Sequence, residues 1–403
     1  MIRVLEVQSR TLATGALAML NVMAVLLAAA PAASQSSLAG RGLGLPMPAL
    51  DARSIGWGGV SIGLPSGTLS MSDPAAAADL TVPAVTFTFQ SSWGTAERGA
   101  LSDDFTGTRF PVVAVSYPSS FGVFFVHAGG LLDQRSRSTT TQEISLEGTD
   151  ARARVIDEFS ADGGVSAVRL GFTRNVGPAL SLAVFGGRTL GSTRRSFVRT
   201  FDSLDIETDL PPFSSVGEWK YRGWNAGAGF GVRFGSIGRV AASWTWSGDV
   251  DAIPTEATEG EGRSYAFPQE LRLGGSAVLA PGLVVAASLD HTNWSTSNAD
   301  LTAATAEDAL RWGAGVEWQA LSIFGKSSAL RLGYRGADLP FHSATESTAA
   351  ESALTVGLGI DLLTSRDVNL ARLDFGLERG SRTVGALTEN FVRLSTSVRV
   401  SGF

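Results

Sequence analysis

Charged side chains in the second half of the chain alternate with apolar ones, and they are the residues best placed to do chemistry. A period of two puts the charges on one face of a strand and the apolar residues on the other. Guanidinium and carboxylate groups on a common face can bind a ligand carboxylate or pair with one another. The set comprises Arg233, Arg272, Arg311, Glu317, Arg331, Asp361 and Asp374.

Catalytic and metal-binding patterns are weak. His127, His291 and His342 are far apart in sequence and lack metal-ligand spacing. His291, Asn293 and Ser295 stand together like the parts of a barrel-embedded hydrolase, but they fit better as a rim at the end of one strand. The chain has no cysteine, which excludes disulfides and thiolate metal sites. We therefore expect no enzyme, no metal and no cofactor.

The composition limits the partners. The 403 residues are 17% charged and include 47 glycines, so charge is scarce and glycine abundant for a soluble domain. A net charge of −6 argues against a nucleic-acid partner, which would need a basic face.

The N-terminus has the order of a secretory signal. Arg3 and Arg10 precede the apolar run Leu12–Ala30, and small residues follow. We expect cleavage between Ala32 and Gln35 and assign residues 1–33 to the signal peptide. The alternative is an uncleaved membrane anchor, since the run approaches spanning length.

Residues 84–403 read as strands with one apolar and one polar face. Leu354, Val356, Leu358, Ile360 and Leu362 alternate with polar or small residues, and so do Leu373, Phe375 and Leu377. Turn formers cluster at 118–120, 175–178, 235–238 and 280–282. Long polar stretches, which we expect to form loops at the opposite rim, fall at 133–157, 190–217, 249–266, 295–308 and 339–351. The fold class is all-β: a single transmembrane up-and-down antiparallel barrel of about 14 strands.

A secreted soluble β-protein would also show alternation, with its apolar face inside. Three features favour lipid on the apolar side. The strands are about ten residues long, the chain is exported, and only a closed barrel pairs every backbone group in hydrocarbon. Aromatic residues also stand near strand ends, where an interfacial girdle would lie: Trp244, Trp246, Trp294, Trp312, Trp318 and Tyr334.

The last residue, Phe403, resembles the C-terminal aromatic signal read by barrel-assembly machinery. Counting back in twos from Phe403 gives Ser401 and Arg399, which is the polar face. A bulge at Gly402 would restore the phase.

Residues 34–83 do not fit the strand pattern, and we assign them to an N-terminal plug, or hatch. The glycines Gly56, Gly58 and Gly59 are followed by Asp73, Pro74 and Ala75. These motifs resemble the N-terminal region of the FadL/OmpP1-like outer-membrane family and its PorV/PorQ-type relatives, with Asp73 in place of the usual Asn. The likeness continues through 267–295, 309–318, 329–340 and 354–362.

The resemblance implies a lumen closed by the hatch and passage of hydrophobic compounds such as long-chain fatty acids. The hatch glycines would let the backbone approach the barrel closely, or they form an ordinary glycine-rich turn. The inward arginines would meet a carboxylate head group or, as we favour, pair with Glu317, Asp361, Asp374 and Glu378.

Two function classes remain open: a transporter of hydrophobic compounds, and a PorV/PorQ-like scaffold associated with secretion. For either we expect a monomer in the outer membrane of a Gram-negative-type bacterium. Its partners would be outer-membrane lipid, hydrophobic small molecules and the assembly machinery.

Overall fold

The computed structural model describes residues 36–65, 67–145, 152–203, 211–301, 305–342, 349–365 and 368–402. The expected signal peptide lies outside this part of the chain, and so does Phe403. No helix in the described ranges is both long and apolar enough to cross a membrane.

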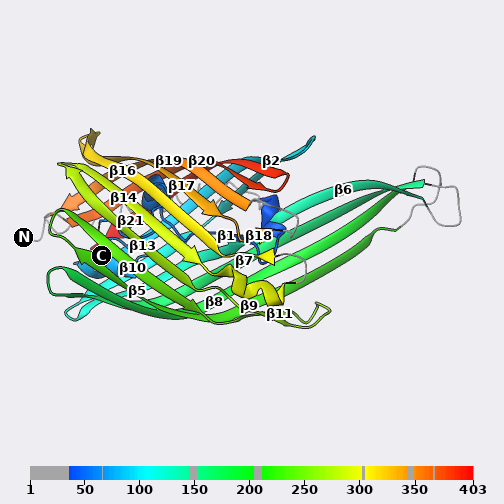
Figure 1. The fold of residues 1–403 in the computed structure, drawn as a ribbon, viewed down its shortest axis with the longest axis horizontal. Helices are drawn as coiled ribbons and strands as arrows, with labels where there is room; N and C mark the ends of the chain where they lie inside the picture. Colours follow the sequence, from blue (N-terminus) through cyan, green and yellow to red (C-terminus); the bar gives the residue numbers. More distant parts are fainter. Residues whose placement is uncertain are drawn as a thin grey trace, which may run out of the picture. The chain divides into compact units, whose positions relative to one another are not determined.

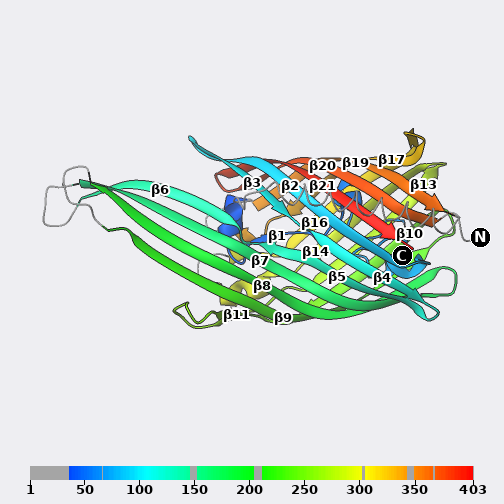
Figure 2. The ribbon, with the colours of Figure 1, turned by 180° about the vertical axis from the view of Figure 1, so that it is seen from behind.

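The strands form an antiparallel barrel (Figures 1 and 2). Its wall contains β2 (Ala84–Arg98), β3 (Leu101–Arg109), β4 (Val112–Ser119), β5 (Gly122–Asp133), β6 (Ser136–Ser145), β7 (Arg152–Val176), β8 (Leu180–Ser203), β9 (Phe213–Arg233), β10 (Gly238–Ser247), β11 (Val250–Pro254), β12 (Arg263–Tyr265), β13 (Glu270–Ala280), β14 (Leu283–Thr292), β16 (Ala309–Ile323), β17 (Lys326–Asp338), β19 (Ala349–Ser365), β20 (Val368–Val384) and β21 (Leu387–Ser401).

Four of the wall positions are divided between two consecutive strands. β3 and β4 both pair with β2, and β5 and β6 both pair with β7. In the same way β10 and β11 both pair with β9. On their other side, β13 pairs with β10 and β12 pairs with β11. Counted so, the described residues give fourteen wall strands, as the sequence predicted.

The barrel closes because its first strand pairs with its last. The register of β2 with β21 runs from Ala84 opposite Ser401 to Arg98 opposite Leu387. Closure leaves no free sheet edge, which is the condition for a sheet to lie in hydrocarbon.

The apolar row faces outward, and this confirms the central prediction. Leu354 and Val356 are exposed on the outer surface, whereas Thr355 and Gly357 between them are buried toward the lumen. Outward aromatic residues agree as well: Trp244, Trp246, Trp312, Trp318 and Tyr334 are each 41–47% exposed. Trp294 is the exception and is described below.

The connections differ at the two rims. Short turns join β4 to β5, β7 to β8, β9 to β10 and β13 to β14, at the four predicted turn sequences. Toward the opposite rim β7, β8 and β9 extend further than their neighbours, with total lengths of 25, 24 and 21 residues. Much of 133–157 and 190–217, which we expected as loops, is therefore strand. The β7–β8 ladder runs unbroken from the short turn to Ala153 opposite Ser203, and the outer part of it contains β-branched and aromatic residues such as Val155, Ile156 and Phe197.

The hatch lies before the barrel in sequence. It contains η1 (Ser37–Gly40), β1 (Leu45–Pro46), α2 (Ala52–Gly56) and η2 (Pro74–Asp79). β1 pairs with β5, so this segment is hydrogen-bonded to the wall. Between wall strands lie η3 (Trp294–Asp300) and the short pair of β15 (Thr305–Ala306) with β18 (Phe341–His342).

Candidate functional site: hatch and lumen

The glycine motif of the hatch packs against the barrel wall. Asp51 caps α2 by accepting a hydrogen bond from the Ser54 backbone at 2.7 Å, and the chain then turns sharply. Gly58 and Gly59 have φ of 75° and 71°, a region that glycine occupies without strain. A Cβ on Gly58 would lie 2.4 Å from the Ala314 carbonyl oxygen and 2.6 Å from the Tyr334 nitrogen. Close approach, as well as turning, therefore requires glycine here.

The wall supplies glycines opposite this motif. A Cβ on Gly313 would lie 2.2 Å from the Gly58 carbonyl oxygen, and one on Gly333 would lie 2.2 Å from the Gly58 nitrogen. Gly56 faces Gly357, where an added Cβ would come within 2.8 Å of the partner's Cα in either direction. We call these residues the glycine seam: Gly56 and Gly58 of the hatch with Gly313, Gly333 and Gly357 of the wall. Along the seam, backbone packs directly on backbone.

Polar wall side chains hold the hatch backbone on either side of the seam. The Ala52 nitrogen donates to the Ser397 hydroxyl at 2.7 Å, and the Gly58 nitrogen donates to Thr355 at 2.9 Å. The Ser61 nitrogen donates to the Ser288 hydroxyl at 3.0 Å. These bonds satisfy backbone groups that burial in the lumen would otherwise leave unpaired.

The second motif binds the wall through charge. Asp73 precedes Pro74, the first residue of η2, and is paired with Arg239 of β10, both side chains being 4% exposed. Arg239 Nη2 donates to Asp73 Oδ1 at 2.9 Å, and Arg239 Nη1 donates to the Leu64 carbonyl at 3.1 Å. Pro74 stands against the wall, 3.0 Å from the position of a Cβ on Gly229.

One charged network surrounds Arg331. Its guanidinium donates to Glu317 at 2.5 Å and to Asp374 at 2.8 Å, and its side chain is fully buried. Arg372 bonds to Asp374 and to Asp361, each at 2.9 Å. Arg53 of the hatch lies in the field of Glu317 and Asp374, and burial lowers the pKa of its guanidinium. Four of the charges chosen from sequence thus meet in one place.

The other three arginines of that set face inward but have different partners. Arg272 pairs with Glu270, and both Arg272 and Arg311 lie within 4.0 Å of Asp290, which accepts a 2.6 Å hydrogen bond from Ser61 of the hatch. Arg233 pairs with Asp79 at the end of η2. Within the described ranges no cluster of His, Asp and Glu has the form of a metal site.

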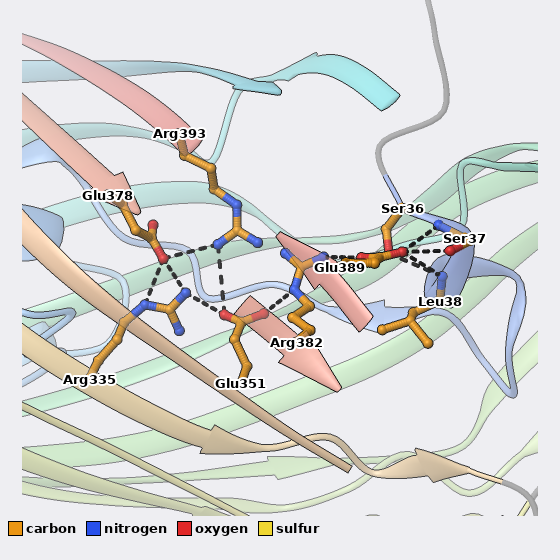
Figure 3. Close-up of polar contacts among 9 residues, drawn as sticks. All are labelled: Ser36, Ser37, Leu38, Arg335, Glu351, Glu378, Arg382, Glu389 and Arg393. Atoms are coloured by element: carbon orange, nitrogen blue, oxygen red, sulfur yellow. Dashed lines mark hydrogen bonds and ion pairs between the residues drawn. The ribbon is translucent and has the colours of Figure 1, made fainter. Parts of the chain in front are cut away.

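The sequence identified only Glu378 among the members of a second network, which Figure 3 shows. Arg335 binds Glu378 and Glu351, and Arg382 joins Glu351 to Glu389. Glu389 is fully buried and accepts hydrogen bonds from the start of the hatch, including 2.8 Å from the Ser37 nitrogen. Its members have the same strand parity as Arg331 and Asp374, which is the signal that could have identified them.

Part of the long-loop end of the lumen is apolar, beside the charged network of Arg335 and Arg382. Ten buried residues pack together there, from β5, β7, β9, β11, η3 and the short strands: Leu43, Leu132, Val165, Tyr221, Val250, Ala252, Phe267, Trp294, Ala306 and Phe341. The expectation that Trp294 lies in the outer girdle is wrong. It is 4% exposed because the chain leaves β14 at Thr292 and turns inward as η3, where Trp294 packs edge-on against Phe267 and Phe341. Asn293 and Ser295 therefore do not continue the strand of His291.

A cavity of about 40 Å³ lies between this cluster and the hatch. Its apolar lining includes Met47 and Met71 of the hatch with Leu131 and Phe267, and its polar lining includes Glu270 and the three arginines Arg169, Arg272 and Arg311. Arg169 is 3% exposed, donates to Asn225 at 3.1 Å and stacks on Phe185 at 4.7 Å. No carboxylate of the described chain forms an ion pair with Arg169, so the cavity has a cationic end. A volume of this size holds only a few water molecules.

Gly402 follows the last residue of β21, at the position where we expected a bulge. Gly402 has φ of 77° and its nitrogen donates to the Pro83 carbonyl at 2.8 Å. Because Phe403 itself lies outside the described residues, its role as an assembly signal stays a prediction.

The fold, a closed antiparallel barrel with the hatch seated in its lumen, is the architecture of FadL-type barrels. No family model matches the sequence, and no curated protein is significantly similar to it. Solved structures are similar in fold. A FadL homologue of Pseudomonas aeruginosa has a TM-score of 0.61 at 11% identity, covering 89% of this chain and 100% of that one. The Ralstonia pickettii toluene transporter TbuX gives 0.56 at 13%, covering 88% and 98%. The Pseudomonas putida toluene transporter TodX gives 0.54 at 14%, covering 89% and 99%. The fold that the sequence resemblance predicted is thereby confirmed.

Proposed function

We propose that the protein is an outer-membrane channel for hydrophobic compounds, with the hatch as its barrier. The observation that carries this proposal is the apolar cluster at the long-loop end of the lumen, which adjoins a cavity bounded by the hatch. A hydrophobic solute crosses the polar outer surface of such a membrane slowly, so an apolar entry inside a barrel gives it a faster path.

The cationic end of the cavity supports amphiphiles with a carboxylate, such as long-chain fatty acids, as substrates. Arg169 would meet the head group while the chain lies against Leu131, Phe267 and the methionines. Met47 and Met71 are flexible thioethers that can move aside, as a cavity of this size requires. Two of the similar structures are named as toluene transporters, which makes uncharged aromatic compounds the alternative class.

The test compares uptake of a long-chain fatty acid with uptake of toluene in cells that carry the intact chain, Arg169→Met or Arg379→Met. Arg379 is exposed on β20 and serves as the control. A carboxylate site predicts that Arg169→Met slows fatty-acid uptake about tenfold and leaves toluene unchanged. If Arg169→Met slowed fatty-acid and toluene uptake equally, the channel proposal would stand but carboxylate recognition would be refuted. If deleting the gene left uptake of both compounds unchanged, the channel proposal itself would be refuted.

The scaffold alternative also has an observation in its favour. The described lumen is filled by the hatch and by two ion networks, and β6 to β9 extend beyond the neighbouring strands as a polar sheet. Purified barrel without co-extracted amphiphile by mass spectrometry, together with loss of surface-exported proteins on truncating this sheet, would favour the scaffold.

A further inference from the structure

Three exposed cations lie on the outer face of β8 and β9, directly above the apolar band on the long-loop side. Arg222 and Lys220 follow Trp224 outward along β9 at every second position, and Arg188 of β8 stands opposite Trp224. Neighbouring strands are about 4.8 Å apart, and same-face residues about 7 Å. The three side chains therefore lie close together on the outer surface. We call Arg188, Lys220 and Arg222 the basic patch.

The patch borders a surface suited to acyl chains. Below it, Val184 is 59% exposed, with Leu170 and Phe230 beside it on the adjoining strands. Arg188 lies over the Trp224 ring with its Cζ 3.4 Å from the centroid, a cation–π contact that fixes the guanidinium at the edge of the apolar band. The combination is amphipathic, since exposed Leu190 lies opposite Arg222 and exposed Ile253 lies opposite Lys220.

The three cations do not form ion pairs with described carboxylates of the protein. Within the described residues none of them has a carboxylate within 4.0 Å. Two acids lie nearby: Asp251 is directly opposite Arg222 and accepts a 2.7 Å hydrogen bond from Ser264, and Glu218 lies one step beyond Lys220, opposite Arg194.

Among the described residues, no other strand carries a group of three exposed cations at this level. On β14, His291 is paired with the carboxylate of Asp308 at 3.7 Å, and β17 ends with an acidic residue, Asp338. On β20 the exposed Arg379 stands alone. The positive charge is therefore concentrated on one sector of the circumference, which general solubility would not require.

We propose that the basic patch binds a phosphorylated saccharolipid of the outer leaflet, of the lipopolysaccharide type. The phosphates bind Arg188, Arg222 and Lys220, and the acyl chains lie on the band beneath. Long loops face the cell exterior in barrels of this class, so the patch lies at the level of the outer head groups. The inference uses the outer-membrane location proposed above but is independent of channel activity.

The experiment titrates the purified mature barrel in detergent with bisphosphorylated lipid A and counts bound lipid by native mass spectrometry. Phosphatidylglycerol is the competing anionic lipid. The variants are the triple change Arg188→Gln, Lys220→Gln, Arg222→Gln and the control Arg379→Gln. All four positions are exposed, and heat-modifiable mobility on gels verifies that each barrel is folded.

The patch predicts that the triple variant binds lipid A about 10- to 100-fold more weakly, whereas Arg379→Gln stays within twofold of the parent. Removing one phosphate from lipid A should weaken binding to the parent chain but not to the triple variant. Unchanged lipid A binding by the triple variant, or equal displacement by phosphatidylglycerol, would overturn the proposal.

Discussion

Asp73 of the hatch and Arg239 of β10 form a buried ion pair that joins the plug to the wall. The carboxylate also accepts a 3.0 Å hydrogen bond from the Gly63 nitrogen, and the guanidinium reaches the Leu64 carbonyl. The similar family motif has Asn at this position. In this chain the carboxylate balances a buried guanidinium, which explains why the residue is acidic.

Replacing Asp73 by Asn should loosen the hatch without unfolding the barrel. The substitution keeps the shape but leaves the guanidinium of Arg239 uncompensated in a buried site, a cost of about 3–5 kcal/mol. Hydrogen exchange of residues 61–80, followed by mass spectrometry, should accelerate. Asp51→Asn is the matched control, because Asn caps a helix as well as Asp does. Equal exchange in both variants would show that the charge is dispensable.

Gly333→Ala should displace the hatch from the glycine seam. The added methyl would lie 2.2 Å from the Gly58 nitrogen, a backbone atom that cannot move alone. We expect faster hydrogen exchange at 56–60. Gly186→Ala on β8 is the control, because no atom lies within 4 Å of a Cβ added there. In this variant, residues 56–60 should exchange at the rate of the parent protein. A seated hatch in Gly333→Ala would contradict the close packing described here.

Arg331→Met should destabilise the barrel far more than Arg233→Met. Removing Arg331 leaves Glu317 and Asp374 without their shared cation in a buried site, at a cost of about 3–5 kcal/mol. The pair of Arg233 with Asp79 is partly exposed, and its loss should cost about 1 kcal/mol or less. Urea unfolding in lipid vesicles, followed by tryptophan fluorescence, measures both. Similar midpoints for the two variants would refute the ranking.

The turn that carries Trp294 should open in acid. Asp308 accepts a 3.1 Å hydrogen bond from the Ser295 nitrogen, and hydrogen bonding with Ser295 lowers the pKa of this carboxyl group. The stabilisation is complete above the ordinary aspartate pKa of about 3.9 and is lost as the pH falls through the lowered value. The difference in fluorescence between the parent and Trp294→Phe should shift to the red below about pH 4. In Asp308→Asn the shift should be absent; its persistence would assign it to other groups.

Much of the fold could be predicted because strand parity is a local signal. The alternation around Leu354 and Val356 fixes which face each strand turns to the lumen, and the turn sequences fix where the strands reverse. The same parity placed Glu317, Arg331 and Asp374 inside, but it could not give their partners. Those depend on which strands become neighbours and on how the register aligns them.

The hatch could be predicted only in part. Glycines at 56, 58 and 59 indicate a close approach, yet the complementary Gly313, Gly333 and Gly357 look in the sequence like ordinary strand glycines. Trp294 was misplaced for a related reason. The strand pattern of β14 does not indicate that the chain bends inward after Thr292. The bend is favoured because it buries Trp294 against Phe267.

The pairing of β2 with β21 also governs when the molecule can assemble. Residues about 300 positions apart must meet along fifteen rungs, so the ring cannot shut until synthesis has reached the final segment. The hatch precedes β2 and ends inside the barrel. It must therefore be in place when the barrel closes, or enter the lumen afterwards. A chain that ended before Leu387 would leave β2 and β20 as unpaired sheet edges, which readily pair with other chains.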